Sequence, residues 1–144
     1  MVKEKTYITN GKNETIFLGE EFAENIKLGE IILLHGNLGS GKTTFTQGLA
    51  KGLGIKRRII SPTFIIVRHY GLSKGNFYHI DLYRTEDNLD ILGLGIGEIL
   101  SDKNNIVSIE WAEKLKDFLP KDRTEIHFKY INENKREIKI LKYE

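Results

Sequence analysis

Short apolar segments recur along the chain, and their spacing alternates between that of strands and that of helices. Continuous or alternating apolar residues predict strands over residues 6–9, 31–34, 64–70, 76–82, 105–109, 125–131 and 136–143. Helical spacing predicts helices over residues 14–26, 45–53 and 112–118, with a further helix starting at 85–88. Alternation of this kind is typical of an α/β sheet, and the turn at 132–135 predicts a β-hairpin at the end of the chain.

The first predicted helix carries an apolar stripe that should face the core. The stripe consists of Ile16, Phe17, Phe22, Ala23 and Ile26. Gly29 and the glycines at 52 and 54 predict the ends of the first two helices. Residues 93–97 contain three glycines, so this segment is expected to be irregular.

Length and composition limit the classes of protein that the chain can represent. Its 144 residues suit one domain over 1–144, and no internal repeat or linker divides them. The net charge of only +2 is weaker than that of a dedicated nucleic-acid-binding domain, so basic clusters such as 56–58 are expected to be solvated surface. The apolar runs are too short to cross a bilayer, and the first residues contain no secretory signal. The absence of cysteine excludes disulfides and fits a cytoplasmic protein.

Residues 36–43 form a complete phosphate-loop motif, G-x-x-x-x-G-K-[ST]. The motif follows an apolar strand and precedes an apolar-periodic helix, which is the context that makes such a match specific. Backbone amides of the loop should surround a β-phosphate, Lys42 should contact the β- and γ-phosphates, and the Thr43 hydroxyl should bind Mg²⁺. The residues expected to bind nucleotide here are Leu38, Gly39, Ser40, Gly41, Lys42, Thr43 and Thr44. The motif predicts a P-loop NTPase-like three-layer sandwich with a central, mostly parallel sheet and a C-terminal β-hairpin.

Two acidic residues stand at the ends of predicted strands, where a triphosphate site needs a carboxylate for its metal ion. Glu110 follows Ile106-Val107-Ser108-Ile109, which is the position of a Walker B acid, and it is the better candidate metal ligand. Asp81 ends the strand that begins at Asn76, and it either contacts the metal indirectly or orients the attacking water. Each acid has a simpler alternative as a helix cap or a surface ion pair.

Other polar and aromatic residues near these motifs have less specific patterns. Trp111, the only tryptophan, is more typical of a core residue than of a stacking surface, and His79 is expected to be a packed or capping histidine. Arg84 either contacts phosphate or pairs with a carboxylate. Residues 61–64, Ser-Pro-Thr-Phe, are either a simple turn or a segment that senses the γ-phosphate.

Taken in order, these segments resemble the TsaE (YjeE) family, the small ATPase of the bacterial machinery that makes threonylcarbamoyladenosine on transfer RNA. The resemblance runs from about Glu14 to the terminal hairpin. It rests on Glu14-Thr15 with Leu18-Gly19, the loop at 36–44, Gln47-Gly48-Leu49, the Ser-Pro-Thr-Phe segment, the His-Ile-Asp-Leu-Tyr-Arg segment at 79–84, and Ile109-Glu110-Trp111. The phosphate loop is shared by many enzymes, whereas the ordered set is highly specific.

The resemblance implies roles for individual residues. Thr43 and Glu110 would ligate Mg²⁺, and Asp81 would belong to the region needed for ATP hydrolysis. Thr15 would lie near the nucleotide base, and Trp111 would lie beside the site. The implied partners are the TsaB and TsaD proteins, with ATP hydrolysis resetting their complex between rounds of modification at adenosine 37 of tRNAs that read codons beginning with A. Transfer RNA would then be an indirect partner.

Lys42, Asp81 and Glu110 are therefore the candidate catalytic residues, with ATP and Mg²⁺ as cofactors. Lys42, the loop amides and Mg²⁺ would stabilise the charge that develops on the transferred phosphoryl group. No arginine is clearly placed to assist them, so hydrolysis should be slow until a partner completes the site.

Three other functions remain open for a phosphate-loop protein of this size. A small-molecule kinase would transfer the γ-phosphoryl group to a hydroxyl, but such enzymes usually have an arginine-containing lid, and arginine is sparse here. A GTP-driven switch would need an Asn-Lys-x-Asp segment, which is absent: Asn134-Lys135 is followed by Arg136-Glu137. A nucleotide-binding scaffold that does not hydrolyse would tolerate Lys42→Ala without loss of function.

Overall fold

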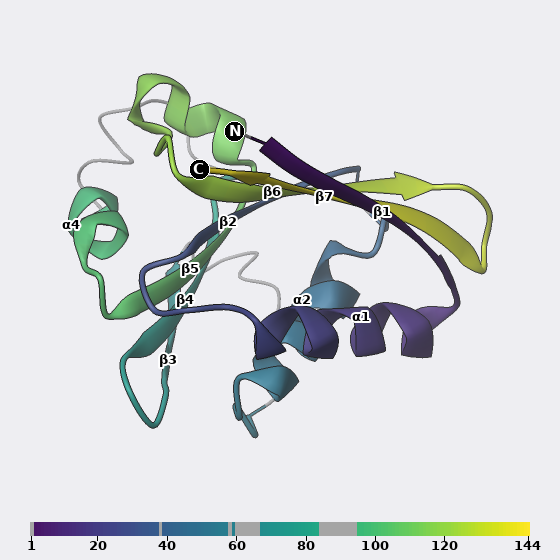
Figure 1. Ribbon diagram of the computed structural model, residues 1–144, viewed down its shortest axis with the longest axis horizontal. Helices are drawn as coiled ribbons and strands as arrows, with labels where there is room; N and C mark the ends of the chain where they lie inside the picture. Colours follow the sequence, from purple (N-terminus) through teal and green to yellow (C-terminus); the bar gives the residue numbers. More distant parts are fainter. Residues whose placement is uncertain (1, 38, 58, 60–66, 84–94) are drawn as a thin grey trace.

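The computed structural model describes residues 2–37, 39–57, 59, 67–83 and 95–144, apart from the side chains of residues 116 and 117. Within these residues, seven strands form one sheet in the order β1-β7-β6-β2-β5-β4-β3 (Figure 1). The strands are β1 (Val2–Asn10), β2 (Ile31–His35), β3 (Val67–Gly71), β4 (Asn76–Asp81), β5 (Asn105–Glu110), β6 (Arg123–Tyr130) and β7 (Lys135–Tyr143). The helices are α1 (Lys12–Glu24), α2 (Lys42–Gly52), α4 (Ile96–Ser101) and the 3-10 helix η1 (Ala112–Phe118). No described helix is long and apolar enough to cross a membrane.

The four central strands, β6, β2, β5 and β4, run parallel to one another. The outer pairings, β1 with β7, β7 with β6 and β4 with β3, are antiparallel. The expected α/β fold with parallel central strands and a C-terminal β-hairpin is confirmed. Because parallel strands bring their carboxyl ends to one edge of the sheet, β2, β4 and β5 end side by side, and ligands in such folds bind at this edge.

Helices cover both faces of the sheet, so the fold has three layers. Side chains of β2 alternate between the faces: Ile32 and Leu34 belong to the core formed with α1 and α2, whereas Ile31 and Leu33 belong to the core formed with α4 and η1. Figure 1 shows α1 and α2 together on one side of the sheet and η1 on the other. Burial on both faces explains why the first four residues of β2, 31–34, are all apolar rather than alternating with polar residues.

Two glycines allow α1 and α2 to approach closely, and this contact fixes the helix that follows the phosphate loop. A Cβ atom at Gly48 of α2 would lie 1.9 Å from the carbonyl oxygen of Ile16 in α1. A Cβ atom at Gly19 of α1 would lie 2.4 Å from the carbonyl oxygen of Phe45 in α2. Both obstacles are rigid backbone atoms, so any larger residue would push the helices apart.

The predicted inward stripe of the first helix is partly wrong. Ala23 is buried, but Phe17 is 59% exposed, and the buried positions are Thr15, Leu18, Gly19 and Ala23. The error arose because the prediction chose the large apolar residues. The close contact with α2 instead places the small residue Gly19 inward, and Phe17 lies on another face of the helix.

Other differences concern element type and extent. The predicted helix at 112–118 is a 3-10 helix, and the short helix α4 (Ile96–Ser101) begins within the segment expected to be irregular. Gly95 precedes α4 with φ +74, a left-handed conformation that glycine adopts without strain, so the glycine-rich sequence leads into a helix. Of the predicted strand 64–70, residues 67–70 lie in β3, and residues 64–66 lie outside the described residues, as does the predicted helix start at 85–88.

Candidate functional site

A cavity of about 490 Å³ lies at the carboxyl edge of the central strands, where the phosphate-loop motif joins β2 to α2. Its walls come from four places: the start of α1, the loop and first turn of α2, the ends of β4 and β5, and the β6–β7 hairpin. The lining residues are Gly11, Lys12, Thr15, Gly39, Gly41, Lys42, Thr43, Thr44, Asp81, Tyr83, Glu110, Trp111, Glu133, Asn134 and Arg136. The cavity therefore brings together most of the residues that the sequence singled out.

The start of α2 is suited to an anion. Its N-cap is Gly41, which has a left-handed backbone, makes no side-chain cap and is followed by no acidic residue in the first turn. The first amides of a helix have no partner within it, and the helix dipole is positive at this end. Because no side chain of the helix satisfies these groups, they remain available to a phosphate.

Most residues of the phosphate loop border this cavity. Gly39, Gly41, Lys42, Thr43 and Thr44 line the cavity. The Ser40 side chain is buried, and its hydroxyl makes no hydrogen bond among the described residues. Leu38 lies outside the described residues. Contact of these residues with nucleotide stays a prediction.

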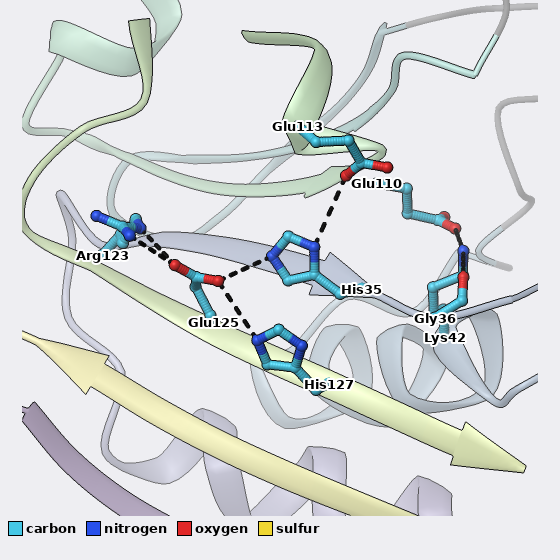
Figure 2. A network of polar contacts seen from close by, with 8 residues as sticks. All are labelled: His35, Gly36, Lys42, Glu110, Glu113, Arg123, Glu125 and His127. Atoms are coloured by element: carbon cyan, nitrogen blue, oxygen red, sulfur yellow. Dashed lines mark hydrogen bonds and ion pairs between the residues drawn. The ribbon is translucent and has the colours of Figure 1, made fainter. Parts of the chain in front are cut away.

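Lys42 lines this cavity and is buried, although lysine is rarely buried without a partner. Its Nζ donates a hydrogen bond to the carbonyl oxygen of Gly36 over 2.7 Å and lies 3.6 Å from Oε1 of Glu110. Figure 2 shows these contacts, in which Lys42 connects the start of the loop to the end of β5. The ammonium group is thus held in place beside the uncapped helix end.

The two predicted acids lie on neighbouring strands. Asp81 and Glu110 are register partners in the parallel pairing of β4 with β5, so their backbones stand side by side. Both side chains line the cavity. Glu110 is buried, whereas Asp81 is half-buried and its Oδ1 accepts a hydrogen bond of 2.9 Å from the Tyr83 backbone amide. Convergence of the two acids on one cavity is the arrangement that their positions at strand ends predicted.

His79 lies behind Glu110 and is fully buried. Its Nε2 lies 2.9 Å from Oε2 of Glu110. Burial alone would raise the pKa of Glu110, but the hydrogen bond and charge of His79, with the charge of Lys42, lower that pKa overall. An ionised Glu110 can only accept, so Nε2 of His79 donates the hydrogen bond. His79 therefore orients the carboxylate rather than merely packing in the core, a role that the sequence analysis missed.

For Asp81, the contributions to the pKa have the opposite net effect. Burial, with a contribution from the negative charge of Glu110, raises the pKa of Asp81, although the hydrogen bond from Tyr83 and the positive groups nearby oppose this shift. Two carboxyl groups at one cavity edge with their pKa values displaced in opposite directions are typical of functional sites.

Trp111 follows Glu110 and forms part of the cavity wall, beside the site as expected. Its φ of +62 is left-handed, a conformation that costs a bulky residue about 1–3 kcal/mol and that persists mainly at functional sites. The indole lies 5.0 Å from Nζ of Lys42 and 5.0 Å from the ring of Tyr83, measured to ring centroids. Trp111 is therefore a wall residue of the cavity that also packs, partly buried, against the core on the η1 face of the sheet, so the expectation of a core residue is partly confirmed.

Arg136 is a second residue that the sequence analysis missed. It lies on β7, lines the cavity, and donates a hydrogen bond of 3.2 Å from Nη2 to the carbonyl oxygen of Gly39 in the loop. Its guanidinium group also lies 4.5 Å from the ring centroid of Tyr130. No local sequence pattern reveals this contact, because Arg136 belongs to the terminal hairpin and lies 97 positions after Gly39 along the chain.

Thr15 of α1 also lines the cavity. Its side chain is buried, and its hydroxyl lies 2.8 Å from that of Thr9 on β1. This contact fixes the start of α1 beside the phosphate loop. The expected position of Thr15 near a nucleotide base is compatible with its place in the wall and stays a prediction.

The donor set also fits a hard cation. The Thr43 hydroxyl and the carboxylates of Glu110 and Asp81 all line the cavity, and Mg²⁺ prefers such oxygen ligands. The cavity thus combines the free amides at the start of α2, a buried ammonium group and these oxygen ligands. Such a combination holds a nucleoside polyphosphate with its metal ion. Fold and site together define a P-loop-type nucleotide-binding protein.

Comparison with known proteins identifies the family within that class. The family described as "Threonylcarbamoyl adenosine biosynthesis protein TsaE" matches residues 9–138. A relative named "tRNA threonylcarbamoyladenosine biosynthesis protein TsaE" from Rickettsia prowazekii is 40% identical over 134 residues, which are 92% of this chain and 92% of that protein. The Bacillus subtilis protein of the same name is 37% identical over 137 residues, 95% of this chain and 85% of that one. The chain therefore belongs to the TsaE family.

A solved structure supports the same conclusion at the level of the fold. The crystal structure of Bacillus subtilis YdiB superimposes with a TM-score of 0.82 and 33% sequence identity. The match covers 100% of this chain and 88% of the other. As a member of the TsaE family, the protein has a role in the biosynthesis of threonylcarbamoyladenosine in tRNA.

Proposed function

We propose that this protein binds ATP with Mg²⁺ in the cavity at the carboxyl edge of the sheet and hydrolyses it. One observation carries the proposal: the buried ammonium of Lys42, the uncapped start of α2 and the carboxylate of Glu110 converge on one cavity. In the reaction, a water oxygen forms a bond to the γ-phosphorus while the bond from that phosphorus to the β–γ bridging oxygen breaks. ADP, inorganic phosphate and a proton are released.

The residues of the cavity have different roles in this reaction. The loop amides and Lys42 bind the β- and γ-phosphates and stabilise the negative charge of the transition state. Thr43 and Glu110 hold Mg²⁺, and His79 keeps the Glu110 carboxylate ionised and correctly turned. When bound, Mg²⁺ neutralises charge on the phosphate oxygens. Asp81, beside Glu110, orients the attacking water or a water of the metal shell.

We further propose that hydrolysis serves a complex with TsaB and TsaD, which modifies adenosine 37 of tRNAs that read codons beginning with A. The names of the relatives place them in this biosynthesis, and the family membership supports the same setting for this chain. The net charge of +2 favours an indirect connection with tRNA through these protein partners. In the cavity Arg136 contacts the Gly39 carbonyl, so a change at the hairpin on partner docking would reach the phosphate loop directly.

The test is steady-state phosphate release from ATP, measured with Mg²⁺ or with EDTA, for the protein alone and with TsaB and TsaD added together. We expect slow Mg²⁺-dependent hydrolysis without any acceptor and a clear increase with the partners. Hydrolysis that needs an added hydroxyl acceptor would indicate the kinase alternative. Equal rates with and without the partners would contradict the proposed setting but leave the ATPase assignment standing.

Asp81→Asn should separate stability from activity. The pKa of Asp81 is raised in the folded protein, so its ionised form costs stability above the unfolded pKa of about 3.9, and the cost disappears as the pH falls below that value. The amide keeps an oxygen for the Tyr83 hydrogen bond. At neutral pH we expect the melting temperature to rise by about 1–2 °C. Hydrolysis should fall at least about 100-fold, because a neutral group orients water poorly.

Asp102→Asn is the matched control, because the exposed Asp102 makes the same kind of contact: its Oδ1 accepts a 2.9 Å hydrogen bond from the amide two residues later. Thermal melts at neutral pH and near pH 4 measure stability, and phosphate release measures hydrolysis. The higher melting temperature at neutral pH and the slower hydrolysis should appear in Asp81→Asn and not in Asp102→Asn. An Asp81→Asn protein with full activity would remove Asp81 from the reaction.

A further inference from the structure

A second polar cluster lies on the sheet face that η1 covers, and the proposed ATPase does not use it. Its members are His35 at the end of β2 and Glu125 and His127 on β6. His35 and His127 are register partners in the parallel pairing of β2 with β6, and Glu125 precedes His127 by two residues and so shares its face. The chain therefore places two imidazoles and one carboxylate together on neighbouring strands.

The three side chains point toward one another, as Figure 2 shows. Oε1 of Glu125 lies 3.1 Å from Nε2 of His35 and 3.4 Å from Nε2 of His127. The two imidazole rings are stacked, with centroids 4.6 Å apart. One potential ligand atom from each residue lies within 4.8 Å of the others. Nε2 of His35 is buried and has no hydrogen bond of acceptable geometry with any described residue, despite the short distance to Glu125.

Two neighbouring residues orient this cluster. Arg123 binds the other carboxylate oxygen of Glu125, Oε2, with both Nε and Nη2 at 2.7 Å, which leaves Oε1 directed at the histidines. Oε2 of Glu113 on η1 lies 3.7 Å from Nδ1 of His35, on the side of the ring away from Glu125. A carboxylate on the outer nitrogen of a histidine is the usual support of a metal-bound imidazole, because it fixes the tautomer and the ring orientation.

We propose that His35, Glu125 and His127 bind a divalent transition-metal ion, with Zn²⁺ as the expected ion. Two imidazole nitrogens and one carboxylate oxygen are a common ligand set for zinc, and Mg²⁺ would prefer oxygen ligands alone. The two negative charges of Glu113 and Glu125 exceed the single positive charge of Arg123, so the local charge favours a cation. Three protein ligands leave a fourth position for water or for a ligand from another molecule.

The position of this site links it to the phosphate loop. His35 directly precedes Gly36, whose carbonyl oxygen accepts the hydrogen bond from Lys42. A metal ion at His35 would fix the end of β2 from the opposite side of the loop. The site itself does not depend on the ATPase proposal, because its ligands lie outside the residues that line the nucleotide cavity.

The test is calorimetric titration of the full chain with ZnCl₂ alone, without nucleotide or Mg²⁺. We expect one zinc ion per chain at micromolar affinity or tighter. His127→Ala should weaken this binding at least about tenfold, since loss of a supporting residue alone typically costs 10- to 100-fold. His127 is 44% exposed, so the variant should fold, which circular dichroism checks.

His69→Ala is the matched control, because His69 is an exposed strand histidine outside the cluster, hydrogen-bonded to Asn76. It should bind zinc like the parent protein. Co²⁺ titration supplies a second readout: visible absorption typical of a four-coordinate ion should appear in the parent and in His69→Ala and be lost in His127→Ala. Stoichiometric zinc binding that His127→Ala leaves unchanged, or no binding by the parent protein, would overturn the proposal and leave a simple ion-pair cluster.

Discussion

Lys42→Ala should lose ATP hydrolysis almost completely, by about 10³-fold or more, which corresponds to roughly 4 kcal/mol of transition-state stabilisation. The expected loss is large because the ammonium is buried and already held by the carbonyl of Gly36, so it needs no reorganisation to meet the phosphates. Phosphate release measures the loss. Trp111 is the only tryptophan and lies 5.0 Å from Nζ of Lys42, so its fluorescence reports nucleotide binding to the same variant.

Lys51→Ala is the control for Lys42→Ala. Lys51 lies at the other end of α2, is highly exposed and forms a surface ion pair with Glu20. Such pairs contribute little to stability, so this variant should hydrolyse ATP like the parent. If Lys42→Ala kept its hydrolysis, or if both variants lost it equally, Lys42 would not be the residue that stabilises the transferred phosphoryl group.

The elements that the sequence predicted well are those whose pattern is local. The apolar run of β2, the alternating strands of the terminal hairpin and the helix after the phosphate loop all carry their own periodicity. Phe17 was misplaced because the inward face of α1 depends on the close approach of α2 at Gly48, which no local pattern reveals. The helix α4 was missed because glycines surround its start, and the left-handed Gly95 leads into it.

In the candidate site, too, the residues that were predicted are those whose position follows from a local pattern. Lys42, Asp81 and Glu110 stand directly after strands or at a helix start, so their convergence followed from the rule that parallel strands end at one edge. His79 and Arg136 could not be assigned in this way. Their partners, Glu110 and Gly39, lie 31 and 97 residues away along the chain, and the contacts depend on strand register and on the return of the hairpin.

Glu110→Gln should separate metal binding from the folding of the site. Glutamine keeps an oxygen that can accept the hydrogen bond from His79, so the variant avoids the orphaned buried imidazole that alanine would leave. It lacks the negative charge that lies beside Lys42 and that a Mg²⁺ ion requires. We expect hydrolysis to fall by about 10²- to 10³-fold, as for loss of a major electrostatic contact in other enzymes.

The decisive measurement for Glu110 is the Mg²⁺ dependence. In the parent protein, Mg²⁺ should tighten ATP binding as reported by Trp111 fluorescence, whereas in Glu110→Gln the curves with Mg²⁺ and with EDTA should nearly coincide. Glu98→Gln, an exposed change on α4, should behave like the parent. Because His79 holds Glu110 by one oxygen while Lys42 lies near the other, the carboxylate is positioned before any ligand arrives. A Glu110→Gln protein with normal Mg²⁺ dependence would show that this prepared carboxylate serves only to neutralise Lys42.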